Sequence, residues 1–526
     1  MKGAQALLRT LQACGLDTCF MNPGTSEMHF VASLDDVPAV RPVLGLFEGV
    51  VTGAADGFGR MAGRPAATLL HLGPGLANGL ANLHNARRAK SPIVNIVGDH
   101  ATYHTAFDAP LESDIESLAR PMSGWYRRSQ RPADVVTDAT DAVVASLGPP
   151  HRVATLVLPA DVSWLDVDDS AVPSGIPAPM RHAGSRAAVG DDVVSAVAAV
   201  LRRSEPAALL MGASSVLEPG LVAASRVAEH TGARLLAESF PGRLQRGAGL
   251  PAVERLAYLG EFAALQMAGL RHLILVDART PVSAFAYPGM PSDLVPEGCE
   301  VHVLAGPGDD AVGALEALAE QSGAPAGGAK LAPASRPSLP EGALTAASVA
   351  AAVGALLPEG AIVSDEAITA GIYVPGATEG APRHDLLSLS GNSIGQGLPL
   401  SIGAAVACPD RPVLALEADG SAMYTIQALW TQAREGLNVT NVIYDNGSYA
   451  ILNVELGRVG ADAGGPAARS MLEIGRPGLD FVAISEGLGV PAERATTAEE
   501  FNKALAAALG EEGPHLIQAV LPRGAL

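Results

Sequence analysis

Short apolar segments alternate with longer segments of helical periodicity along most of the chain. Strand–helix–strand order of this kind predicts parallel sheets covered by helices on both faces. We therefore predict an α/β protein made of doubly wound parallel sheets. The expected helices of the first part are Ala4–Ala13, Gly49–Met61 and Leu76–Ala89. The expected strands are Asp17–Met21, Val43–Phe47, Ala67–His71, Pro92–Val97, Ala207–Met211, Ala233–Ala237, His272–Val276, Glu300–Leu304, Ala361–Ser364, Leu386–Leu389, Val413–Glu417 and Val439–Tyr444.

Two segments without helical or strand periodicity divide this pattern into three. Ser170–Ala187 and Ser322–Glu341 are rich in Pro, Gly, Ser and Ala, which is typical of linkers. In a chain of 526 residues, they predict domains at 1–170, 186–325 and 341–526. Each range has the size of an ordinary domain.

Charge and cysteine content exclude several classes of function. The net charge of −20 argues against binding to nucleic acid through bulk charge. None of the four cysteines forms a CxxC pair, so neither a disulfide framework nor a thiolate metal site is expected. No apolar run reaches the ~18 residues of a membrane span. The first residues also lack the apolar segment of a signal peptide, so we expect a cytoplasmic location.

Two polar clusters each follow a predicted strand and give the strongest chemical signal. Glu417–Ser421 contains Asp419, and Tyr444–Ser448 contains Asn446, 27 positions later. Ligands of open α/β sheets bind at the carboxyl ends of the strands. Carboxylate and amide oxygens suit Mg²⁺, while the backbone N–H groups of Gly420 and Ser421 suit a phosphate. The alternative is a pair of ordinary polar turns.

The sequence Asp419-Gly420-Ser421, with Asn446 downstream, resembles the GDG…N signature of thiamine diphosphate enzymes. Ala418 stands where that family usually has Gly, and Asp445 where it has the first Asn of an NN pair. The resemblance implies a Mg²⁺ ion held by Asp419, Asn446 and the backbone carbonyl of Ser448. It also implies that Gly420 and Ser421 contact the diphosphate.

The first third of the chain resembles the same family independently. Glu48 precedes Gly53–Arg60, as the activating glutamate does in the family segment E…A.GYaR. The resemblance implies that Glu48 is catalytic and hydrogen-bonds the pyrimidine ring of the cofactor. The structural alternative is a solvated glutamate in the first turn of a helix, favoured by the helix dipole.

Three further loops extend the resemblance along the chain. Asn22–Glu27 resembles the family's NPGs-E loop, Gly73–Gly75 with Asn78 resembles its GPG…N loop, and Gly391–Pro399 resembles the loop that supports the bent cofactor. The implied cofactor-binding residues in these loops are Gly24, Gly75, Asn78, Asn392 and Ile394, together with Thr369 by its order along the chain.

The resemblance covers almost the whole chain, in the order pyrimidine-binding, middle and diphosphate-binding domain. Acetolactate synthases, benzoylformate decarboxylases and pyruvate oxidases share that order. It implies a homodimer or homotetramer with active sites between subunits, acting on a small 2-oxo acid. The expected reaction is decarboxylation followed by release of an aldehyde or, as in acetolactate synthases, by carboligation to a hydroxyketone. The alternatives are a simple decarboxylase of the benzoylformate type and a non-catalytic or regulatory paralogue. A phosphate-binding oxidoreductase is disfavoured because no glycine fingerprint is present.

Residues of the expected substrate pocket bear on this choice. His71 and Thr25 stand in contexts that resemble benzoylformate decarboxylase, where a histidine moves protons and a hydroxyl contacts the substrate. That enzyme's second histidine has no counterpart, since Phe285 holds the matching position. His84, His100 and His104 are secondary candidates. The turn Met211–Ser215 is only a faint hint of FAD, so we expect a middle domain without flavin.

Overall fold

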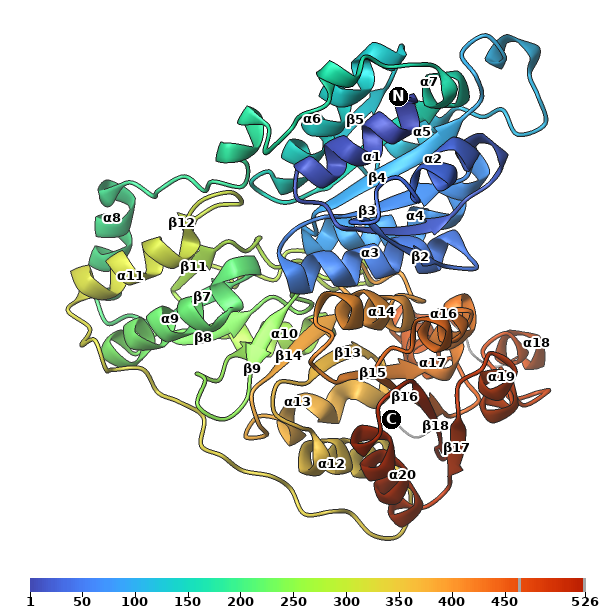
Figure 1. The fold of residues 1–526 in the computed structure, drawn as a ribbon. Coiled ribbons are helices and arrows are strands. Elements are labelled where there is room, and N and C mark those ends of the chain that lie inside the picture. Colours follow the sequence, from blue (N-terminus) through green and yellow to red (C-terminus); the bar gives the residue numbers. More distant parts are fainter. Residues whose placement is uncertain (462–464, 524–526) are drawn as a thin grey trace.

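The computed structural model describes residues 1–461 and 465–523, and its described strands form three sheets (Figure 1). The three sheets lie in separate regions, with the blue-to-teal first part above, the green middle part to one side and the orange-to-red last part below (Figure 1). Two sheets are entirely parallel and the third has one antiparallel edge strand. The prediction of three doubly wound parallel sheets is confirmed.

The first sheet has the order β2-β1-β3-β4-β6-β5. Its strands β3, β4 and β6 are buried along their whole length, as expected of parallel strands covered on both faces. The strands are β1 Thr18–Asn22, β2 Arg41–Leu44, β3 Ala66–Leu70, β4 Ile93–Asp99, β5 Trp125–Arg128 and β6 Val153–Pro159. The helices are α1 Gly3–Ala13, α2 Met28–Ser33, α3 Glu48–Ala62, α4 Leu72–Ala89, α5 Ile115–Ala119, α6 Val135–Leu147 and α7 Ala160–Trp164.

The second sheet, of order β10-β8-β7-β11-β12, has helices on both faces. Its strands are β7 Ala207–Met211, β8 Arg234–Ala237, β10 Glu254–Arg255, β11 His272–Val276 and β12 Glu300–Ala305. Its helices are α8 Asp191–Leu201, α9 Glu218–Thr231, α10 Gly260–Met267 and α11 Ala311–Ser322. Residues 323–345, all described, contain no helix or named strand and run along the molecule from α11 to α12 (Figure 1).

The third sheet has the order β17-β18-β16-β15-β13-β14-β9, and β9 joins it antiparallel to β14. Its strands are β9 Leu244–Arg246, β13 Ile362–Glu366, β14 His384–Ser388, β15 Val413–Ala418, β16 Val439–Asp445, β17 Ala492–Ala495 and β18 His515–Val520. Its helices are α12 Ala346–Leu356, α13 Val374–Ala377, α14 Gly397–Ala407, α15 Asp419–Thr425, α16 Ala428–Glu435, α17 Ala450–Arg458, α18 Pro466–Ser470, α19 Phe481–Gly487 and α20 Ala498–Gly510. Strand β9 belongs to the range predicted as the middle domain, but it pairs with a strand of the third sheet. The predicted domain limits stay predictions.

Helices α3 and α14 pack closely enough to fix the first sheet against the third. A Cβ atom at Gly57 would collide with the carbonyl of Leu400, and one at Gly403 with the carbonyl of Ala54. Glycine at these positions therefore allows the two backbones to touch. Because Glu48 begins α3 and the loop 391–396 leads into α14, this contact places two of the predicted cofactor loops.

Candidate active site

Glu48 is the first residue of α3 and follows the extended residue Phe47. Its side chain is buried, with the residue only 6% exposed, so it is not the solvated glutamate of the alternative interpretation. Its Oε2 atom accepts a hydrogen bond of 2.9 Å from Nδ2 of Asn78. A Cβ atom at Gly75 would lie 3.1 Å from Oε1 of Glu48, so glycine keeps the space beside the carboxylate open. The structure thus brings Glu48, Gly75 and Asn78 together.

His71 lies on the neighbouring loop and pairs with a buried carboxylate. Its Nδ1 atom is 2.7 Å from Oε2 of Glu27, which also accepts the backbone N–H of Gly24 at 2.7 Å. A Cβ atom at Gly24 would collide with the His71 ring. Burial raises the pKa of Glu27, and the nearby His71 partly opposes that rise. Thr25 sits on the same loop and is exposed.

Glu27 is a residue whose importance the sequence did not reveal. It ends the loop motif Asn22–Glu27, but its partner His71 is 44 positions away. The pairing exists because β1 and β3 are adjacent and parallel, with Asn22 opposite Leu70. The Oε1 atom of Glu27 is buried without a hydrogen-bond partner in the described chain, so part of its acceptor capacity is unused.

Asp419 begins α15 directly after β15, and Asn446 follows the adjacent strand β16. One carboxylate oxygen of Asp419 accepts the N–H of Gly420 at 2.8 Å; the other accepts those of Asn446 and Gly447 at 3.0 and 2.7 Å. Burial raises the pKa of Asp419 to about 6. A cavity of about 120 Å³, lined by Asp419 and Asn446 among others, lies beside these groups. Asp419 and Asn446 are thus side by side, as predicted.

Gly420, Ser421 and Ser448 are also predicted to belong to this site. Ser421 is buried in the first turn of α15, and the ring of Tyr449 fills the space beside Gly420. The Oδ1 atom of Asn446 accepts the N–H of Ser448, and the carbonyl of Ser448 accepts that of Ala450, both at 2.9 Å. A carbonyl has two lone pairs, so one remains for a ligand.

The loop 391–396 is held by hydrogen bonds to the first part of the chain and to Glu366 of its own sheet. Asn392 adopts a left-handed backbone with a φ of 57°, and Ile394 is half-buried. The carbonyl of Ser393 accepts Nδ2 of Asn85 at 2.7 Å from the first part of the chain. Thr369 stands at the N-terminal end of the short 3₁₀ helix Ala370–Tyr373. Among the described residues of one chain, no direct hydrogen bond joins Glu48, Gly75 or Asn78 to Asp419 or Asn446.

The three secondary histidine candidates lie in two different places. Nε2 of His84 lies 3.0 Å from the carbonyl of Gly391, which ties α4 to the loop 391–396. The rings of His100 and His104 lie 5.3 Å apart on the segment after β4. Phe285 is exposed. None of these observations assigns a chemical role.

Two buried glutamates behind the loop 391–396 were not expected from the sequence. The carboxylate of Glu366 accepts the backbone N–H groups of Gly395, Gln396 and Gly397, and burial raises its pKa to about 7. Glu417 is fully buried, and neither of its oxygens has a hydrogen-bond partner of normal geometry in the described chain. Burial and the nearby Glu366 raise the pKa of Glu417 well above its usual range.

Glu417→Gln is expected to flatten the pH dependence of stability. A carboxyl whose pKa is raised on folding contributes stability that is fully present below its unfolded pKa and lost as the pH rises through the folded pKa. Urea unfolding of the variant from pH 4 to 8, beside an exposed control, Glu229→Gln, would measure the effect. Parallel curves for wild type and Glu417→Gln would contradict it.

The turn at Met211–Ser215 offers little to a flavin diphosphate. A Cβ atom at Gly212 would lie 2.6 Å from a carboxylate oxygen of Glu238 and 2.7 Å from the carbonyl of Asp277. Asp277 is itself paired with Lys90 at 2.8 Å. Oxygen atoms thus crowd the end of β7, where an anion would need N–H donors.

Comparison with known proteins places these features in one family. Residues 1–118 match the model of the thiamine pyrophosphate enzyme N-terminal TPP binding domain, and residues 376–519 match that of the C-terminal TPP binding domain. A protein of Mycobacterium tuberculosis H37Rv named "Putative acetolactate synthase large subunit IlvX" is 61% identical over 523 residues, 99% of each chain. Benzoylformate decarboxylase of Pseudomonas aeruginosa PAO1 is 32% identical, over 97% of this chain and 96% of that protein.

The fold has solved counterparts. The thiamine diphosphate-dependent 4-hydroxybenzoylformate decarboxylase of Rhodococcus jostii RHA1 superposes with a TM-score of 0.85 and 24% identity, covering 100% of both chains. Because the sequence identity is only 24%, this comparison supports the fold alone. No described helix has the length and apolar character that crossing a membrane requires. With both cofactor-domain models matched and a relative that is 61% identical along nearly its entire length, the chain belongs to the thiamine pyrophosphate enzyme family.

Proposed function

We propose that the protein uses thiamine diphosphate and Mg²⁺ to decarboxylate a 2-oxo acid, and then releases an aldehyde or joins the remaining carbon unit to a second carbonyl. The observation that carries the proposal is the buried Glu48 at the start of α3, beside Asn78 and the open space at Gly75. The names of the two relatives, an acetolactate synthase subunit and benzoylformate decarboxylase, fit this class of reaction.

The residues present suit the cofactor and its metal ion. Asp419, Asn446 and the Ser448 carbonyl offer the hard oxygen ligands that Mg²⁺ requires, next to a cavity of about 120 Å³. Gly420 and Ser421 would contact the diphosphate, with Thr369 on the adjacent strand end. Gly24, Gly75, Asn78, Asn392 and Ile394 would line the remainder of the cofactor. When bound, thiamine diphosphate supplies the carbon nucleophile and the electron sink for the loss of CO₂.

Glu48 would hold the pyrimidine ring and control its proton. Its carboxyl is shielded from water, so a hydrogen bond to a ring nitrogen would meet little competition from solvent. Asn78 donates to Oε2 and fixes the rotation of the carboxyl, which leaves Oε1 facing the space at Gly75. A bound ring in that space would therefore meet a preoriented acid.

His71 would give and take protons at the substrate. With Nδ1 donating to Glu27, the lone pair of Nε2 is directed away from the buried carboxylate. Glu27 therefore orients the imidazole. This pair favours protonation, the step that releases an aldehyde, and so supports the simple decarboxylase as the second candidate.

A panel of 2-oxo acids separates these outcomes. The purified protein is analysed by mass spectrometry for bound cofactor and by absorbance for flavin. It is then incubated with pyruvate, branched and aromatic 2-oxo acids while CO₂, aldehyde and hydroxyketone are measured. An aldehyde alone supports the simple decarboxylase, and a hydroxyketone supports the carboligase. Bound cofactor without CO₂ from any donor would favour the non-catalytic paralogue.

His71→Ala is expected to lower kcat by roughly 10²–10⁴-fold, the usual contribution of a positioned proton donor, while KM changes little. Glu27→Gln is expected to lower kcat less, because the imidazole keeps its place but loses the carboxylate that orients it. Steady-state kinetics on the best 2-oxo acid provide the measurement. The control is His182→Ala, at an exposed histidine outside the loops. An unchanged kcat for His71→Ala would assign His71 to the scaffold.

A further inference from the structure

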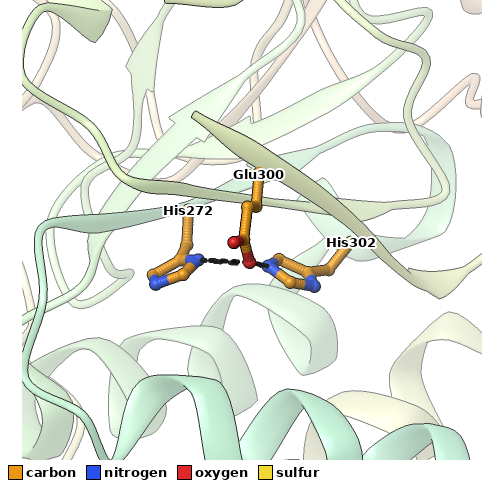
Figure 2. Close-up of side chains that lie close together, drawn as sticks. All are labelled: His272, Glu300 and His302. Carbon is orange, nitrogen blue, oxygen red and sulfur yellow. Dashed lines mark hydrogen bonds and ion pairs between the residues drawn. The ribbon is translucent and has the colours of Figure 1, made fainter. Parts of the chain in front are cut away.

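Three potential metal ligands meet at the edge of the second sheet. His272 is the first residue of β11, Glu300 is the first residue of β12, and His302 follows two positions later. The two strands are parallel with His272 opposite Glu300. Side chains alternate between the faces of a strand, so Glu300 and His302 share one face. Figure 2 shows the three side chains converging, with the carboxylate between the two rings.

The separations of the three donor atoms suit one small metal ion. Nδ1 of His272 lies 3.2 Å from Nε2 of His302 and 3.6 Å from Oε2 of Glu300, and those last two atoms are 3.8 Å apart. A point about 2.1 Å from all three atoms exists in the plane of this triangle, which matches the length of zinc–nitrogen and zinc–oxygen bonds. The donors therefore need little movement to close on an ion.

A fourth residue orients the most buried ligand. Nε2 of His272 lies 3.0 Å from Oε2 of Glu205, on the loop before β7. If Nε2–H donates to this carboxylate, the lone pair of Nδ1 faces His302 and Glu300, which is the tautomer that can bind a metal. Histidine ligands commonly donate their second ring N–H to a carboxylate in this way.

We propose that His272, Glu300 and His302 bind a divalent transition-metal ion, with zinc as the ion that fits the donor set best. Two imidazoles and one carboxylate form a recognised ligand set for zinc, which keeps a fourth position for water. Glu300 is 65% exposed, so solvent can reach that position. The site is separate from the Mg²⁺ site of the proposed function, which lies at the third sheet beyond the carboxyl ends of β15 and β16.

The position of the site indicates what the ion would do. β12 is the edge strand of its sheet, and its first four residues are exposed or half-buried. An exposed edge is the part of a sheet that most readily frays or pairs wrongly. An ion shared by Glu300, His302 and the buried His272 would fasten the start of β12 to β11, and binding to the folded state alone would stabilise the chain.

Zinc binding is tested on the full chain prepared without a histidine tag. The protein is stripped with a chelator and dialysed against excess Mg²⁺, so that the predicted thiamine diphosphate site is kept from zinc. It is then titrated with Zn²⁺, with the bound metal counted by mass spectrometry. We expect one zinc ion per chain and a higher melting temperature with zinc than without it. Titration with Co²⁺ should give the visible absorption of a four-coordinate ion.

Four variants decide whether the named residues hold the ion. His302→Ala and Glu300→Gln alter accessible side chains and are expected to abolish or greatly weaken binding. Glu205→Gln, which disturbs only the orienting contact, should weaken it by about 10–100-fold. His182→Ala, an exposed histidine elsewhere, should bind as wild type does. Circular dichroism confirms that each variant is folded. The proposal is overturned if the wild type binds no zinc, or if His302→Ala and Glu300→Gln both bind it with unchanged stoichiometry and affinity.

Discussion

Glu48→Gln is expected to slow exchange of the C2 proton of bound thiamine diphosphate by roughly 10²–10⁴-fold, while the affinity for the cofactor changes little. Glutamine keeps the shape of the side chain and can still meet Asn78, but it cannot supply or accept the proton that a carboxyl can. Transfer of the C2 proton to deuterated water, followed by NMR after rapid quenching, measures the exchange directly. Isothermal titration measures the cofactor affinity of the same preparation.

Glu218→Gln is a matched control for this variant. Glu218 is also the first residue of a helix, α9, so its replacement removes the same favourable interaction with a helix dipole at a site away from the loops. This control should leave exchange and turnover unchanged. If Glu48→Gln also left exchange unchanged, the proton role proposed for Glu48 would be wrong, even if the protein proved to be a decarboxylase.

Asp419→Ala is expected to abolish metal-dependent retention of thiamine diphosphate. The substitution removes the carboxylate ligand proposed for Mg²⁺ and leaves the N–H groups of Gly420, Asn446 and Gly447 without their acceptor. Both losses disturb the turn that carries the other two ligands. Gel filtration of loaded protein with Mg²⁺ or EDTA, followed by cofactor assay, measures retention. Asp191→Ala is the control, since Asp191 begins helix α8 and is exposed. Normal, EDTA-sensitive retention by Asp419→Ala would exclude Asp419 as a ligand.

Glu48→Gln and Asp419→Ala together test whether each active site is shared between two subunits. Glu48 lies in the first part of the chain and Asp419 in the last part, and among the described residues of one chain no direct hydrogen bond joins the two. If each active site takes Glu48 from one subunit and Asp419 from its partner, a dimer of one Glu48→Gln chain and one Asp419→Ala chain contains one intact site. Mixing the two inactive variants under conditions of subunit exchange should then restore part of the activity. No recovery, with exchange verified by mass spectrometry, would argue against a shared site.

The local pattern of the sequence predicted several buried strands well, but it did not predict the fully buried β6 or the largely buried β18. β7 and β11 begin and end at the predicted residues, because short, mainly apolar runs next to turn or charged residues have few alternative structures. Several edge strands, among them β5 and β9, were also missed, although the edge strand β12 was predicted from its first residue. β5 has four half-buried residues, and β9 has three residues whose partner strand, β14, lies more than 130 positions away. Such strands form because they pair with strands that are distant in the sequence, and the local sequence pattern does not show that pairing.

The start of helix α4 also differs from the prediction made from the local pattern. α4 begins at Leu72 rather than at Leu76, so Gly73, Pro74 and Gly75 lie inside its first turn. Proline is tolerated there because the first N–H groups of a helix have no acceptor within the helix. This early start places Gly75 against Glu48, a contact that the sequence indicated only through its resemblance to a family.

By itself, the sequence determined the fold class, because fold class follows from local periodicity, and it indicated candidate side chains for the chemistry through motifs that resemble a known family. Only the tertiary structure decided which of these side chains meet. Glu27 pairs with His71, and His272 lies beside Glu300 and His302, because parallel strands are adjacent in a particular register. A shift of that register would move these side chains apart without changing any local pattern, and the energy that sets it comes from packing of the whole sheet against its helices.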